Sequence, residues 1–226
     1  MRYGIYGGSF DPIHWGHLLL AETCLRKANL DRVIFVPSGC SPHRAKANQT
    51  PGPLRAEMIE LAVAGCDEFS VSRFEIEREQ TSYTVETVRH FRNALPPDAE
   101  LFLLVGADMY NDLPHWFEAA EILRNVIPVG VWRPGGPPPH AEVFQDGVTP
   151  ERLELFRRHI VPMPLIEISS TLIRRAVADG ESVRFLLPHP VEALIRSHRL
   201  YQAEETLRPE NRCERREGGS PRDGIE

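Results

Sequence analysis

The sequence predicts an α/β protein with a doubly wound, mostly parallel sheet and helices on both faces. Short β-type runs alternate with helix-type runs along most of the chain, as expected for strands joined by helical crossovers. The run Leu101–Val105 is apolar throughout, as in a central parallel strand that is covered on both sides. Together these two observations predict a Rossmann-like open sheet.

The elements follow in order from local patterns. Runs of β-branched, aromatic and aliphatic residues predict strands at Arg2–Tyr6, Arg32–Pro37, Phe69–Ser72, Glu100–Gly106, Val126–Trp132 and Ile160–Ile166. Helical patterns between them lie near Leu18–Ala28, Leu54–Ala64, Thr84–Ala94 and Glu118–Leu123. A further helix begins at Ser169 or Ser170, either of which can cap it, and ends at Gly180.

Two loops stand out at strand ends. Pro37–Pro53 is rich in Pro, Ser, Asn and Gly, and Arg133–His140 contains four prolines and two glycines. The composition of Arg133–His140 suits neither a helix nor a central strand. Both loops follow the carboxyl ends of expected strands, which is the edge where open α/β sheets bind ligands.

The composition limits the class of protein. The net charge of −6 disfavours non-specific binding of DNA or RNA. The four cysteines are scattered without a C-x-x-C pair, so neither a zinc site nor a disulfide framework is expected. No apolar stretch approaches the roughly 20 residues that span a bilayer, and no signal peptide is visible. We therefore expect a cytoplasmic protein with no membrane partner.

We expect residues 1–201 to form the folded domain. The segment Gln202–Glu226 is charged and lacks apolar periodicity, so it predicts a disordered tail. The sequence leaves the oligomeric state open.

The most informative stretch is Gly7–Leu18, which reads as a strand end, a glycine turn and a helix start. That junction is where open α/β sheets bind phosphates, because free amides and the positive helix end both point there. The stretch contains neither a G-x-G-x-x-G fingerprint nor a P-loop, so imidazoles and amides must meet the phosphates. The candidate ATP-binding residues here are Gly7, Gly8, Ser9, Phe10, His14, Gly16 and His17.

This stretch resembles the signature of the nucleotidyltransferase superfamily, in which a His-x-Gly-His element grips the triphosphate of ATP or CTP. The element is His14-Trp15-Gly16-His17 here. The resemblance implies catalytic roles for His14 and His17. Trp15 departs from the polar or smaller residue that the family most often has at this position.

A second cluster, Ile168–Ala176, places hydroxyls and an arginine at one helix start. It resembles the segment that closes the ATP site opposite His-x-Gly-His in the same superfamily. The resemblance implies that Ser170 and Thr171 contact phosphates and that Arg174 is a catalytic residue on the β or γ phosphate. Whether Ser169 or Ser170 makes the closer contact stays open.

Several motifs follow one another between Tyr3 and Tyr201: Val36–Arg44, Thr81–Thr87, Val105–Asp108 with Trp116 beyond it, Trp132–Gly135, and segments of Phe185–Tyr201. In this order they resemble the bacterial nicotinate-mononucleotide adenylyltransferase family. A pyridine ring favours an aromatic face such as Trp116, which lies just past an expected strand. By resemblance, the amides of Thr84 and Phe117 read the carboxylate. The remaining candidates are Gly106 and Asp108 for ATP, and Arg44, Tyr83, Asp108 and Arg133 for the acceptor. We interpret Arg55, Glu57, Glu75, Glu77 and Glu79 as ordinary solvated charges.

The implied reaction joins ATP and nicotinate mononucleotide into deamido-NAD and releases pyrophosphate. Mg²⁺ is expected as a cofactor held mainly by the ATP phosphates and water, with no protein metal ligands. The alternatives are an adenylyltransferase that uses nicotinamide mononucleotide, phosphopantetheine or another phosphate acceptor, and a non-catalytic nucleotide-binding protein. A cytidylyltransferase is disfavoured, because the second cluster reads Ile-Ser-Ser-Thr.

Overall fold

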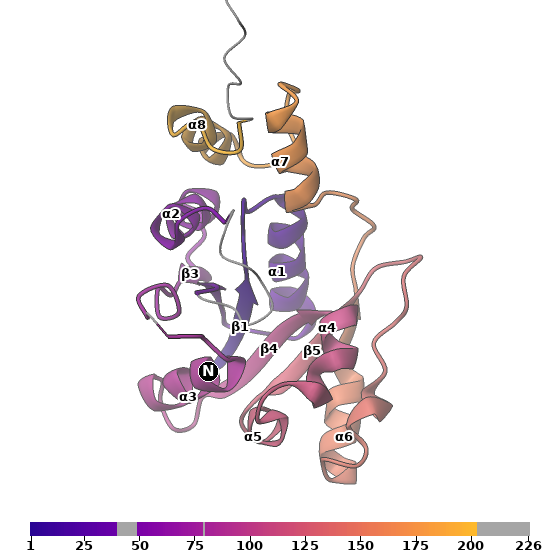
Figure 1. Ribbon diagram of the computed structural model, residues 1–226. Helices are drawn as coiled ribbons and strands as arrows, with labels where there is room; N and C mark the ends of the chain where they lie inside the picture. Colours follow the sequence, from indigo (N-terminus) through magenta and orange to yellow (C-terminus); the bar gives the residue numbers. More distant parts are fainter. Residues whose placement is uncertain (40–48, 79, 203–226) are drawn as a thin grey trace, which may run out of the picture.

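The computed structural model describes residues 1–39, 49–78 and 80–202 (Figure 1). Within these residues one sheet contains the strands β1 (Arg2–Gly8), β2 (Arg32–Pro37), β3 (Phe69–Val71), β4 (Glu100–Gly106), β5 (Ile127–Trp132) and β6 (Ile160–Pro162). All neighbouring strands pair in parallel, in the order β3-β2-β1-β4-β5-β6. This order reverses between β1 and β4, so the predicted doubly wound fold is confirmed.

Eight α-helices in the described residues surround the sheet. They are α1 (Trp15–Lys27), α2 (Gly52–Val63), α3 (Thr84–Ala94), α4 (Ala107–Asp112), α5 (Ala119–Asn125), α6 (Pro150–Arg158), α7 (Ser170–Ala178) and α8 (His189–Ser197). Two 3₁₀ turns, Leu113–His115 and Ala141–Phe144, complete the list. Figure 1 shows α7 and α8 beside α1 and α2, at the end of the molecule away from α5 and α6.

The core lies along the four inner strands. Ile5, Phe35, Phe102 and Val129 are all buried, as both faces of these strands are covered by helices. The switch point between β1 and β4 therefore has rigid walls, which fix where the loops at the strand ends begin.

Several element boundaries differ from the expected ones. β1 continues to Gly8, and α1 begins at Trp15 because His14 serves as its N-cap. β6 ends at Pro162 instead of Ile166, and Pro164 has no amide hydrogen to extend the ladder. Helices α4, α6 and α8 are not among the expected elements, although Thr149 caps α6 by accepting a hydrogen bond from Arg152 N.

The remaining expectations concern the tail, the two long loops and membrane spans. Most of the expected tail, residues 203–226, lies outside the described residues, as does the segment 40–48 of the first long loop. The loop Arg133–His140 contains neither helix nor strand, as predicted. Among the described helices, none has the length and apolar character needed to cross a membrane.

Candidate active site

The loop after β1 folds around an aromatic side chain. Phe10 has a φ of +46° and its ring is fully buried. This ring packs edge-on against Tyr6 and His17 and contacts Gly8, where a Cβ would lie 2.9 Å from it. Phe10 therefore shapes the loop, and only its backbone is free to meet a nucleotide.

His14 and His17 lie together at the start of α1. Their rings stack with centroids 3.8 Å apart. Gly16 N donates to His14 Nδ1 at 3.1 Å, so in the neutral ring the proton lies on Nε2. A Cβ on Gly16 would lie 2.9 Å from the His14 ring, so this close approach requires glycine. Both histidines therefore lie on one face of the helix start.

Both imidazoles are held neutral. Burial and then the charge of Arg133 lower the pKa of His14 to about 4. Burial, the neighbouring His14 and Arg133 lower the pKa of His17 well below its usual value. His17 Nδ1 is buried and has no hydrogen-bond partner among the described residues. A phosphate bound here would raise the pKa of these imidazoles, because its negative charge favours the protonated ring and its oxygens accept the ring N–H.

Helix α7 docks onto the same loop. Ser169 caps it by accepting a hydrogen bond from Leu172 N, while the Ser170 hydroxyl donates to Pro12 O at 2.9 Å. Arg174 donates to Asp11 O at 2.7 Å and to Thr171 Oγ1 at 3.3 Å. The two sequence clusters therefore meet, 163 residues apart in the chain.

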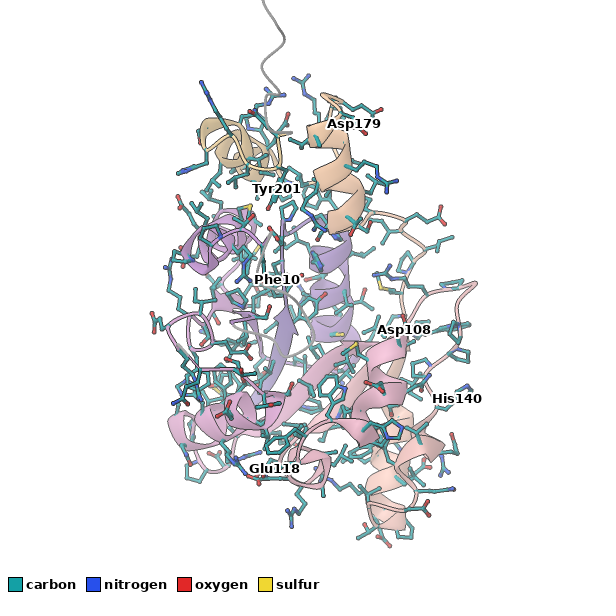
Figure 2. The ribbon with its side chains drawn as sticks, viewed as in Figure 1. Phe10, Asp108, Glu118, His140, Asp179 and Tyr201 are labelled. Carbon is teal, nitrogen blue, oxygen red and sulfur yellow. The ribbon has the colours of Figure 1, made fainter. Side chains whose placement is uncertain are left out.

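Asp11 connects this loop to the end of the folded chain. Its side chain is 4% exposed and accepts hydrogen bonds from Tyr201 OH at 2.6 Å and Thr50 N at 3.3 Å. Figure 2 shows Tyr201 between α7 and α8, above the loop that carries Phe10. Burial, followed by the charge of Asp11, raises the pKa of Tyr201, so its hydroxyl stays protonated as the donor.

The interpretation of Arg55 as a surface charge is wrong. Arg55 is 3% exposed, and its guanidinium donates to three carbonyl oxygens, those of Ser9, Ser38 and Thr50. Planar guanidinium is suited to this task because it offers five donors in a fixed arrangement. The signal was in the sequence: Met58 and Ile59, three and four residues on, place Arg55 on the buried stripe of α2.

A cavity of about 370 Å³ opens at the switch point of the sheet. Its walls come from the ends of β1 and β4, the start of α3 and the segment 109–117. Six of the predicted site residues line it: Gly7, Gly8, Tyr83, Thr84, Trp116 and Phe117. Gly8 connects the two centres, because it lines the cavity and also lies against the Phe10 ring, which packs against His17.

Aromatic rings form one wall of this cavity. Tyr83 and Phe117 are in contact, with centroids 4.7 Å apart, and Phe117 is 55% exposed. The indole N–H of Trp116 donates to Asp112 at 3.2 Å, which fixes the ring. Thr84 is the first residue of α3, so its amide has no acceptor within the helix.

The interpretation of Glu75 as a solvated charge is also wrong. Glu75 lines the cavity, where it accepts from Thr87 Oγ1 at 2.6 Å and Gly39 N at 3.4 Å. Burial raises its pKa, although both hydrogen bonds act in the opposite direction. Glu57 and Glu77 are exposed as expected, and Glu79 lies outside the described residues.

The remaining predicted residues lie around these two centres. Gly106 precedes α4 with open space around it, and Asp108 is exposed in the first turn of that helix (Figure 2). Arg133 is exposed after β5, close enough for its charge to act on both histidines. Arg44 lies outside the described residues. One sheet edge therefore carries cationic and imidazole groups on one side and an aromatic cavity on the other.

Comparison with known proteins is consistent with this arrangement. Residues 5–176 match the family model described as Cytidylyltransferase-like. The chain is 39% identical over 207 residues to a Rubrobacter xylanophilus protein named "Probable nicotinate-nucleotide adenylyltransferase", covering 90% of this chain and 94% of that protein. A Thermus thermophilus protein of the same name is 42% identical over 204 residues, covering 89% and 100% of the two chains.

The fold also resembles solved structures. Plasmodium falciparum nicotinic acid mononucleotide adenylyltransferase complexed with NaAD superposes with a TM-score of 0.67 at 15% identity. The superposition covers 88% of this chain and 97% of that chain. At this identity the likeness supports the fold alone.

The Asp11–Tyr201 hydrogen bond predicts the effect of a small change. Tyr201→Phe removes one of two hydrogen-bond donors from a buried carboxylate, and we expect it to lower the free energy of unfolding by about 1.5–3 kcal/mol. Urea denaturation measures this difference. The matched control is Tyr110→Phe, because the buried Tyr110 hydroxyl has no partner among the described residues. Equal destabilisation by both variants would contradict the role of Tyr201.

The neutral His14 predicts a pH dependence of stability. Its pKa is about 4 in the folded protein and about 6.5 in the unfolded chain, so the unfolded chain binds more protons between these values. The free energy of unfolding therefore falls as pH drops from 6.5 to 4, by at most about 1.4 kcal/mol per pH unit from this group. In His14→Asn, which keeps a capping side chain, we expect a shallower decline. Denaturation at several pH values compares the two, and identical slopes would refute the assignment.

Proposed function

The chain belongs to the Cytidylyltransferase-like family and, within it, to the nicotinate-nucleotide adenylyltransferases, and from this membership and the site we infer its reaction. It transfers the adenylyl group of ATP to nicotinate mononucleotide, giving deamido-NAD and pyrophosphate. The substrates are ATP and nicotinate mononucleotide. The single observation that carries the assignment of the site is the stacked His14–His17 pair beside the aromatic cavity, at the switch point of the sheet.

On the triphosphate side, neutral His14 can donate from Nε2, because its Nδ1 is occupied by Gly16 N. The first amides of α7, at Ser170 and Thr171, lack acceptors within the helix and face the same loop. Arg133 and Arg174 add positive charge. The Ser170 hydroxyl donates to Pro12 O, so we assign phosphate contact to its amide.

On the acceptor side, Trp116 offers its face to the pyridine ring, and the Thr84 amide suits the carboxylate. Asp108 suits ribose hydroxyls. A phosphate monoester is already an anionic nucleophile near neutral pH, so it attacks the α-phosphorus without a protein nucleophile. The protein contributes alignment of the two substrates and donors for the oxygens that gain charge.

Mg²⁺ is expected to arrive with ATP. No group of three or more His, Cys, Asp or Glu side chains in the described residues is arranged to hold a metal. We propose that phosphates and water hold the ion, as Mg²⁺ usually keeps several waters and binds through substrate phosphates. When bound, Mg²⁺ neutralises phosphate charge. Cytoplasmic location also stays a prediction.

The test is pyrophosphate release with ATP and Mg²⁺, comparing nicotinate and nicotinamide mononucleotides side by side. We expect a strong preference for the acid, because the Thr84 amide at the positive end of α3 favours a carboxylate. A preference for the amide would keep the reaction and overturn the substrate. Nucleotide binding without pyrophosphate release would indicate a binding protein.

A second expectation concerns His17. His17→Ala should lower kcat by about 10²–10³-fold, the range for removal of one donor to developing charge. The fold should survive, as judged by the thermal transition. His198→Ala, an exposed histidine after α8, is the control and should keep full turnover. Normal turnover in His17→Ala would exclude the role assigned to it.

A further inference from the structure

The charge of the cavity is unusual for a site that receives a nucleotide. Among its described lining residues there is no lysine or arginine. Its titratable side chains are Glu75, Asp112, His115 and Tyr83. Two carboxylates in a partly enclosed space, with no lysine or arginine among the described lining residues, give this part of the cavity a negative potential.

Glu75 is held by neutral hydrogen-bond donors, and among the described residues Arg78 acts on it only through its charge. No ion pair to it occurs among the described residues, and the neighbouring Arg78 instead pairs with Glu86 at 2.6 Å. Its two hydrogen-bond donors, the Thr87 hydroxyl and the Gly39 amide, are neutral. Asp112 likewise accepts from a neutral donor, the indole N–H of Trp116. A carboxylate held by neutral donors inside a cavity keeps its charge available to a ligand.

Two further features point to a ligand at this place. The Ser82 hydroxyl lines the same cavity and is buried without a hydrogen-bond partner in the described part of the chain. Gly39 passes so close to Glu75 that a Cβ there would lie 2.2 Å from Glu75 O. This packing holds the backbone of Glu75 rigidly against the loop after β2, so the carboxylate is positioned and not merely nearby.

The aromatic wall of the cavity also favours a cationic ligand. Tyr83, Trp116 and Phe117 present ring faces, and the negative faces of aromatic rings attract cations. The Thr84 amide at the start of α3 supplies a helix-end donor to the same cavity. A ligand with a cationic ring and one anionic substituent suits both the aromatic wall and the Thr84 amide.

We propose that Glu75 is a specificity-determining residue that supplies the counter-charge for a cationic, N-ribosylated pyridinium ring. The proposal rests on the proposed function, since the ring belongs to the adenylyl acceptor. Glu75 thereby favours the oxidised, positively charged ring over the neutral dihydropyridine ring that carries the same ribose, phosphate and carboxylate.

The experiment measures equilibrium binding of nicotinate mononucleotide and of its 1,4-dihydro form, which differ in ring charge. Wild-type protein should bind the charged form more tightly, by about tenfold or more, as for close charge pairs at interfaces. Glu75→Gln keeps the size of the side chain and the hydrogen bond from Thr87, and should lose most of this preference. Glu77→Gln, exposed two residues away with the same change in net charge, should keep it.

Each outcome decides the matter. Equal binding of both forms by wild-type protein overturns the proposal without any variant, so failure of Glu75→Gln to fold does not prevent the test. Equal loss of affinity for both forms in Glu75→Gln would make Glu75 a packing residue and also overturn it. Binding of neither form by wild-type protein would overturn the proposed substrate itself, whereas ATP-dependent turnover with the charged form would preserve that substrate even if Glu75 proves irrelevant.

Discussion

The rest of the site depends on how the loop between β1 and α1 satisfies its buried polar groups. A loop that exposes amides toward a phosphate buries carbonyl oxygens behind them, and these need donors. Arg55 serves Ser9 O, and Arg174 serves Asp11 O. Tyr201 serves the Asp11 carboxylate. Three distant segments therefore share one task, which couples α2, α7 and the end of the folded chain to the histidine pair.

The same sheet edge separates two kinds of electrostatic environment. On the α1 side, the charge of Arg133 acts on imidazoles that burial keeps neutral, and Arg174 donates to the loop that precedes them. On the α3 side, Glu75 and Asp112 face a cavity without basic side chains among the residues described. The reversal of strand order between β1 and β4 makes this possible, because the loops after the two strands turn to opposite sides. A polyanion would suit the α1 side, and a cationic ring would suit the α3 side.

The sequence predicts the bounds of the apolar strands better than it predicts which charged side chains are buried. Five of the six strands lie within two residues of their expected bounds, and β6 alone ends four residues early. The sequence does not reveal that Arg55 and Glu75 are largely shielded from solvent, because charged residues are normally exposed. That expectation holds at most positions of a chain. Arg55 could have been found from the periodicity of α2, whereas no periodic pattern marks Glu75.

The sequence by itself determined the fold class, the family resemblance and the two clusters predicted to bind phosphates, because periodicity and contiguous motifs are local properties of the chain. Only the tertiary structure decided which side chains complete the site. Tyr201 meets Asp11 across 190 positions, and Glu75 meets Gly39 across 36. Such contacts depend on how helices and strand ends pack, and packing is a property of the whole chain that no local window contains.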